Sequence, residues 1–171
     1  MLIAVYLYNS FPIRDERERR KLWSQWNKID VIASDHAPHT LMEKRTPFAH
    51  APSGIPGVET MIPLLLAEVM NKKISLSDVI RKTSLAPATI LGLPTAGFSP
   101  GNRADFALYP KVQTQIIGDN LHSKCGWTPY EGHRAVFPSR VILGGEQVYF
   151  DGEFTKGSPE WFPGGGYRST R

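Results

Sequence analysis

A short apolar run at residues 29–33, IDVIA, constrains the fold more than any other feature of the chain. It is rich in β-branched residues and carries no polar face, which is typical of a strand in a parallel sheet covered by helices on both sides. An apolar run at residues 1–8 precedes it. Between the two lies a charged segment, residues 15–27, with acid–base pairs at helical spacing. The order strand, helix, strand predicts an α/β fold.

Helical signals continue as far as residue 93. Apolar residues in 58–73 recur at helical spacing, although Pro63 is compatible with a helix only in the first turn or at a kink. Ser75 and Asp78 form a capping pattern for a second helix, and Gly92 is placed to close a third.

Short strands and turns take over after residue 93. Gly144 and Gly145, between RVIL and EQVYF, predict a two-residue hairpin. The expected division is therefore 1–93 for the α/β part and 94–171 for a small β module with a C-terminal tail.

Composition narrows the functional classes. Of 171 residues, 41% are hydrophobic, which suits a globular protein with a buried core. The net charge is +4, but the basic residues are scattered, which disfavours nucleic-acid binding. Cys125 is the single cysteine and rules out an internal disulfide, and no apolar stretch reaches the length of a membrane span. We expect a cytoplasmic protein.

Polar side chains follow the apolar run directly. Asp35 stands at its C-terminal end, where barrel enzymes carry catalytic groups, and its carboxylate suits a divalent metal or the proton of a metal-bound water. His36 and His39 follow around Pro38. An Asx-type turn or a helix cap remains a second interpretation of the same residues. Structural roles are expected for the isolated His50, His122 and His133, and a solvated loop pair for Glu43 and Lys44.

Several separated blocks then resemble one family. They are ASDHAPHT, APSGIPGVETMIPLLL, SLAPATILGL, GNRADFALY, HSKCGWTPYEGH and RVILGGEQVYFDGEF, in this order. Together they resemble the C-terminal part of a dihydroorotase of the amidohydrolase superfamily. The resemblance implies the last strands and helices of a TIM-like (β/α)8 barrel in residues 1–93 and a small β-sandwich-type module in 94–171.

The resemblance also implies roles for single residues. Asp35 would contact the metal site and carry the proton of the hydrolytic water, and His39 would bind the substrate carboxylate. Ser53 and Gly54 would belong to the loop that closes on the pyrimidine ring. Asn9 lies near the family's substrate-binding asparagine, but the register places Ser10 opposite it, so either Asn9 takes the contact by a local shift or the contact is lost.

The family's other zinc ligands are missing from this sequence. A catalytic zinc needs three protein ligands. A full barrel needs roughly 250 residues, and residues 1–93 would supply only about two of its strand–helix units. Three explanations remain. The chain is a piece of a longer enzyme, or it is one half of a split enzyme, or it is an inactive relative. In the second case a missing N-terminal barrel half or a homo-oligomer partner would complete the enzyme.

Two other functions stay open. One is an allantoinase- or hydantoinase-like cyclic amidase, against which His39 and the APSGIPG loop argue. The other is a non-catalytic structural partner, docking onto a protein such as aspartate carbamoyltransferase. For the favoured function, the substrates are dihydroorotate and N-carbamoyl-L-aspartate in pyrimidine synthesis, and zinc is the expected metal.

Overall fold

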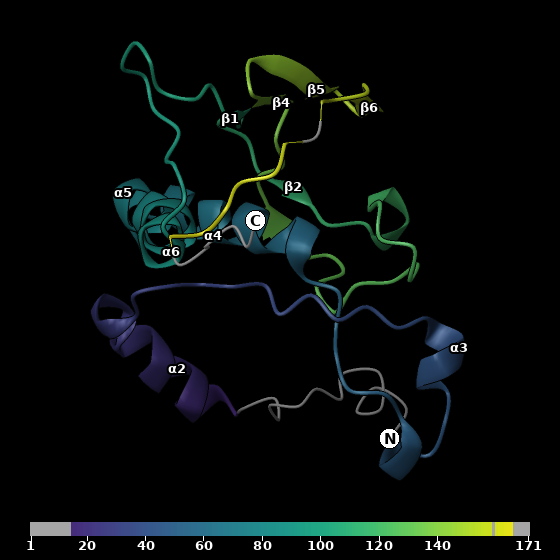
Figure 1. The fold of residues 1–171 in the computed structure, drawn as a ribbon. Coiled ribbons are helices and arrows are strands. Elements are labelled where there is room, and N and C mark those ends of the chain that lie inside the picture. The colour runs from purple at the N-terminus through teal and green to yellow at the C-terminus, as the bar shows by residue number, and fades with distance from the viewer. Residues whose placement is uncertain (1–14, 159, 166–171) are drawn as a thin grey trace.

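The computed structural model describes residues 15–158 and 160–165 (Figure 1). The strand expected at residues 1–8 lies outside the described residues, and so do Asn9 and Ser10. In the part of the chain that is described, helices and strands are mixed, as the sequence predicts. No helix in that part is both long enough and apolar enough to cross a bilayer.

The expected charged helix is present as α2 (Glu16–Ser24). Asp15 caps it, because one carboxylate oxygen accepts a hydrogen bond from a first-turn N–H at 2.8 Å. The sequence places Asp15 four residues before Arg19 and Glu16 four before Arg20; the Glu16–Arg20 pair is formed at 2.8 Å, whereas Arg19 pairs with Glu16 at 2.6 Å. Hydrogen bonds from these two arginines lower the pKa of Glu16 to about 2.

After the short 3-10 turn η1 (Trp26–Lys28), the chain runs to Thr40 beneath α4 (Val58–Met70), from α2 on one side to α3 (Leu41–Lys44) on the other (Figure 1). The prediction of a strand at 29–33 is wrong for this structure. Among the described residues, the 29–33 backbone makes one backbone–backbone hydrogen bond to a distant segment, from the Ile32 N–H to the Lys82 carbonyl at 3.0 Å. A parallel strand is defined by neighbours on its edges, and the described residues provide no strand beside 29–33.

The proline- and glycine-rich segment 35–57 is a loop that includes two short helical turns. It contains a short helix, α3 (Leu41–Lys44), and a 3-10 turn, η2 (Phe48–His50). Thr40 and Glu43 form a capping box around the start of α3, a local pattern that the sequence reading did not use. The prediction of Glu43 and Lys44 as a solvated pair is wrong for Lys44, which is fully buried.

Three helical segments follow, as predicted. They are α4 (Val58–Met70), α5 (Leu76–Ile80) and α6 (Ala86–Leu91), with a π-helical turn, η3 (Arg81–Leu85), joining the last two. Ser75 caps α5 by accepting from the Asp78 N–H at 3.0 Å. Gly92 closes α6 with φ +64°, a left-handed conformation that glycine adopts without cost. Pro63 lies in the second turn of α4, where it interrupts one backbone bond without ending the helix.

The C-terminal region forms two antiparallel sheets. One has the order β1-β4-β5-β6, and the other consists of β2 and β3. The expected Gly144-Gly145 hairpin joins β4 to β5, and Leu143 pairs with Glu146. The strands are β1 (Phe106–Leu108), β2 (Thr114–Gln115), β3 (Arg134–Ala135), β4 (Arg140–Leu143), β5 (Glu146–Phe150) and β6 (Glu153–Phe154).

Several of the best-buried apolar side chains lie where α4 meets the smaller sheet. Ala67, Ile116, Ala135 and Val136 are at most 2% exposed, and the Val136 N–H donates to the Pro63 carbonyl at 3.0 Å. These contacts join the helical region to the β region. The predicted division of the chain at residues 93 and 94 stays a prediction.

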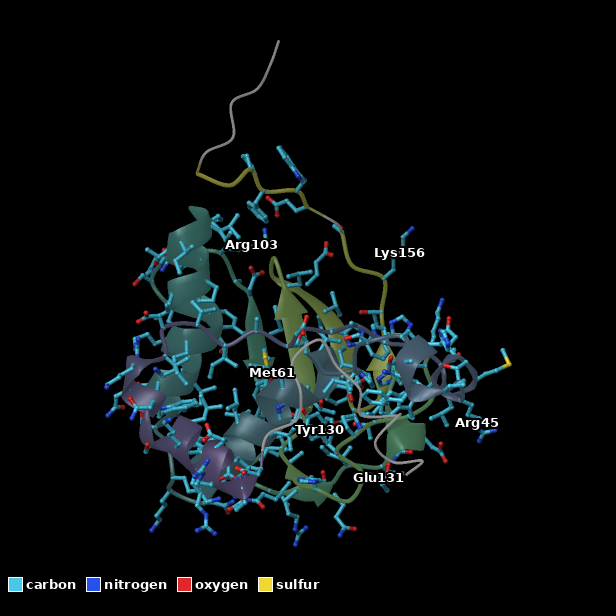
Figure 2. The ribbon with its side chains drawn as sticks, turned by 90° about the horizontal axis from the view of Figure 1, so that it is seen from below. Arg45, Met61, Arg103, Tyr130, Glu131 and Lys156 are labelled. Atoms are coloured by element: carbon cyan, nitrogen blue, oxygen red, sulfur yellow. The ribbon has the colours of Figure 1, made fainter. Side chains whose placement is uncertain are left out.

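The C-terminal segment returns across the molecule. Arg103, labelled near this segment in Figure 2, pairs with Asp105 at 2.5 Å and with Glu160, and stacks on the Phe162 ring at 4.8 Å. Farther on, Gly165 donates its N–H to the Leu91 carbonyl at the end of α6. The tail is thus tied both to the sheet and to the helices.

Candidate active site at the Asp35 loop

Asp35 occupies an unusual backbone conformation. Its φ is +44°, in the left-handed region that aspartate tolerates better than most residues but adopts infrequently. The residue is exposed, and it follows the extended segment 29–34. A residue in this conformation persists only when its surroundings hold it, so the contacts on either side of Asp35 are informative.

The residues after Asp35 are fastened to the loop at 51–57. His36 and Ile55 form a parallel bridge, and the Ala37 N–H donates to the Ile55 carbonyl at 3.1 Å. The imidazole Nδ1 of His36 accepts from the N–H groups of Gly57 and Val58, at 3.1 and 3.3 Å. The Asp35 segment and the loop before α4 therefore form one connected unit.

Two glycines permit this close approach. A Cβ on Gly54 would lie 2.5 Å from the Ala37 carbonyl oxygen, and the φ of Gly54, +128°, is one that side chains rarely allow. A Cβ on Gly57 would lie 2.9 Å from the Ser34 carbonyl oxygen. Gly54, predicted as a substrate-loop residue, is thus also needed to bring that loop against the Asp35 segment.

His39 is held through its backbone. Its carbonyl accepts a hydrogen bond from the Trp127 indole Nε1 at 2.7 Å, and its side chain is 31% exposed. The Glu43 carboxylate lies 3.9 Å from His39 Nδ1. Hydrogen bonds from the Thr40 backbone and hydroxyl lower the pKa of Glu43, and proximity to His39 adds a smaller contribution in the same direction.

Ser53 is half-buried beside Gly54, in a loop anchored by a buried cation. The Lys44 ammonium donates to the Pro52 carbonyl at 2.7 Å, and burial lowers the pKa of Lys44. The structure thus brings Asp35 and Gly54 into two joined segments, with Ser53 next to Gly54. His39 lies four residues beyond Asp35, and Asn9 lies outside the described residues.

Three residues with structural roles around the site escaped the sequence reading: His36, Lys44 and Trp127. The partners of His36 and Lys44 are backbone groups elsewhere in the chain, so no local pattern in the sequence indicates them. Trp127 could have been suspected, because a buried indole N–H requires an acceptor and the residue lies in one of the blocks that resemble the family.

Asp35 stands without companion metal ligands in the described residues. No group of three or more His, Cys, Asp or Glu side chains is placed there to hold a metal ion. Because a catalytic zinc requires three protein ligands, the described residues do not form a zinc site by themselves. Asp35 can still serve as one contact of a site completed elsewhere.

Comparison with known proteins identifies the relatives of this chain. No family model matches it. A dihydroorotase of Halobacterium salinarum is 42% identical over 146 residues, covering 83% of this chain and 34% of that protein. A dihydroorotase of Pyrococcus furiosus is 46% identical over 133 residues, covering 77% and 31%. The chain is related to the C-terminal part of the dihydroorotases.

Among solved structures, a D-hydantoinase (dihydropyrimidinase) from a Thermus species matches with a TM-score of 0.83 and 25% identity, covering 91% of this chain and 36% of that one. The sequence is therefore nearer to the dihydroorotases, while the fold is shared with hydantoinases, which also act on cyclic amides. The chain spans about a third of the length of the dihydroorotases it matches.

Proposed function

We propose that this chain contributes the proton carrier and part of the substrate pocket to a dihydroorotase active site. The observation that carries the proposal is the connected unit of the Asp35 segment and the 51–57 loop. In this unit the residue after His36, Ala37, lies against Gly54 and donates to the Ile55 carbonyl, which supports assigning the Asp35 segment and the 51–57 loop to one site. Sequence identity of 42% and 46% to dihydroorotases supports the choice of substrate.

The proposed chemistry is the reversible hydrolysis of a cyclic amide. Water adds to the ring carbonyl of L-dihydroorotate, and the carbon–nitrogen bond breaks to give N-carbamoyl-L-aspartate. The Asp35 carboxylate would accept a proton from the attacking water and return it to the leaving nitrogen, so that no net proton stays on the enzyme group. His39 would donate to the substrate carboxylate, a charge-assisted contact that orients the ring.

Zinc belongs to this proposal as an expectation. When bound, it would lower the pKa of its water and polarise the ring carbonyl. Asp35 is the residue of this chain that we expect to contact it. We propose that the remaining ligands come from the portion of the enzyme that corresponds to the unmatched two-thirds of its relatives, along with the other strands of a TIM-like barrel. The β-sandwich assignment of residues 94–171 is part of the same proposal.

A hydantoinase-like activity is the second candidate, favoured by the structural match to the Thermus enzyme. Assays that supply dihydroorotate, hydantoin and allantoin in parallel separate the two, since a dihydroorotase should prefer the carboxylated ring that we propose His39 binds. Association with aspartate carbamoyltransferase and a cytoplasmic location stay predictions.

The experiment combines the chain with a polypeptide carrying the remaining barrel strands of a relative, and compares wild type with Asp35→Asn. Loss of the proton carrier should reduce kcat by about 10²- to 10⁴-fold in both directions of the reaction. Asp30→Asn, at an exposed position in the same segment, is the matched control and should retain activity. Full activity of Asp35→Asn would contradict the proposed role.

A further inference from the structure

His36 is a side chain to which sequence reasoning gave no task, yet it makes the most direct connection between the two segments of the site. The residue immediately follows Asp35. Its Nδ1 lies 3.1 Å from the Gly57 nitrogen and 3.3 Å from the Val58 nitrogen, and both N–H groups point at it. A single ring atom therefore joins the Asp35 segment to the start of α4, 21 residues farther along.

These two donors have few other ways to be satisfied. Gly57 is the N-cap of α4 and Val58 its first residue, and the opening N–H groups of a helix have no partner within the helix. N-cap residues with a polar side chain usually satisfy such groups, but glycine has none, and α4 has no side-chain cap of its own. His36 supplies the cap from outside the helix.

The contact fixes the protonation of the ring. Two N–H donors require a lone pair, so Nδ1 must be the unprotonated nitrogen and the proton of the neutral ring must sit on Nε2. The opposite tautomer would place a third N–H against the first two. The geometry thus determines a tautomer that the sequence alone leaves open.

We propose that His36 is a positioning residue that holds Asp35 and the substrate loop in one arrangement, acting as the Nε2-protonated tautomer that caps α4. This inference rests on the proposed function. Asp35 has a left-handed backbone that its surroundings must maintain. The bridge to Ile55 and the close approach of Gly54 hold the backbone of His36 and Ala37. The His36 ring adds a side-chain contact that joins this backbone to α4.

Substitutions separate the acceptor from the bulk of the ring. In His36→Asn the amide oxygen takes nearly the place of Nδ1 and can accept the same bonds. In His36→Gln the oxygen is carried one carbon farther, toward the place of Nε2. His36→Ala removes the acceptor altogether. A positioning role predicts that the asparagine variant keeps the amide protection and the kcat of the wild type, and that the alanine and glutamine variants lose them. The reason is that the role depends only on the position of the acceptor.

The first measurement needs neither a variant nor turnover. Nitrogen-15 NMR of the 171-residue chain, labelled in histidine, should show the His36 ring with an unprotonated Nδ1. Hydrogen exchange should find the Gly57 and Val58 amides protected in wild type and in His36→Asn, and about tenfold or more less protected in His36→Ala and His36→Gln. His50→Ala, at an exposed histidine of η2, should leave both amides unchanged.

The second measurement uses the enzyme completed as above. His36→Ala and His36→Gln should lower kcat by about tenfold to a hundredfold, as expected for a displaced reacting group, while His36→Asn stays near wild type. A protonated Nδ1 in wild type, or an asparagine variant as impaired as the alanine variant, would overturn the inference. A wild-type enzyme with the expected ring and amide signals but no turnover of any cyclic amide would overturn the proposed function instead.

Discussion

Two fully buried lysines stand at opposite ends of the backbone that carries Asp35. Lys82 donates to the carbonyls of Trp26, at 2.9 Å, and Ile29, and lies over the Trp26 ring. Lys44 donates to the Pro52 carbonyl in the 51–57 loop. In each case a buried ammonium group donates to backbone carbonyls of irregular segments, which holds this backbone in place on both sides of the site.

The buried ammonium of Lys44 makes a prediction about pH. Burial lowers its folded-state pKa, so the unfolded chain binds more protons at pH values between that pKa and the ordinary value of 10.5. The free energy of unfolding contributed by this group should therefore rise as pH increases through that window. Lys44→Met should remove the rise. Denaturant titrations followed by tryptophan fluorescence at several alkaline pH values measure it, and equal pH slopes for the two proteins would refute it.

Trp127 gives a prediction about substrate binding. Its indole N–H donates to the His39 carbonyl, so Trp127→Phe keeps most of the apolar ring and removes one hydrogen bond worth about 1 kcal/mol. With His39 less firmly placed, KM for dihydroorotate in the completed enzyme should rise by about fivefold with kcat nearly unchanged. Trp161→Phe, at a residue 68% exposed, is the control. A fall in kcat at constant KM would place Trp127 elsewhere in the mechanism.

At the scale of elements, the sequence predicts those whose signals are local. Ser75 before α5, Gly92 after α6 and the Gly144-Gly145 hairpin each specify their own backbone through caps or turns, and all three are confirmed. The strand expected at 29–33 fails because a parallel strand depends on partners distant in the sequence. The burial of Lys44 and the hydrogen bonds to His36 could not be predicted for the same reason. Lys44 donates to a backbone carbonyl, and His36 accepts from backbone N–H groups, that lie in other segments.

The junction of the Asp35 segment with the substrate loop gives a prediction at this scale. Gly54→Ala adds a methyl group that meets the Ala37 carbonyl at 2.5 Å and strains φ at +128°. Gly101→Ala strains a φ of +90° with no atom within 4 Å of the new methyl. In both variants, backbone strain should lower the free energy of unfolding by about 1–3 kcal/mol. In Gly54→Ala the clash with Ala37 should lower it by about a further 1–3 kcal/mol.

Activity separates the two glycine variants further. The methyl group of Gly54→Ala should push the 51–57 loop away from the Asp35 segment and reduce kcat/KM by about a hundredfold. Gly101→Ala should keep kcat/KM within about twofold of the wild-type value. Thermal unfolding and steady-state kinetics of the completed enzyme provide both readouts. Equal losses of activity in the two variants would show that the close approach at Gly54 has no part in catalysis.

At the scale of the whole molecule, many large apolar side chains stay exposed. Leu22 on α2, Ile90 on α6 and Phe98 before β1 are 61%, 69% and 93% exposed. The helix α2, which carries Leu22 and Trp23, has no buried residue in this structure. Since the chain spans about a third of the length of its dihydroorotase relatives, these surfaces are consistent with our proposal that further barrel strands complete the site.

That proposal makes a prediction about metal content. Asp35 would be a single acidic ligand, and without two more protein ligands it would not hold zinc at useful affinity. The purified chain, dialysed against a trace of zinc, should carry well under one zinc per molecule by elemental analysis and show no turnover of dihydroorotate. Adding the complementary barrel segment should raise both zinc content and activity together, and Asp35→Asn should lower activity more than metal content. About two zinc ions bound to the isolated chain would mean that it builds a metal site from its own residues.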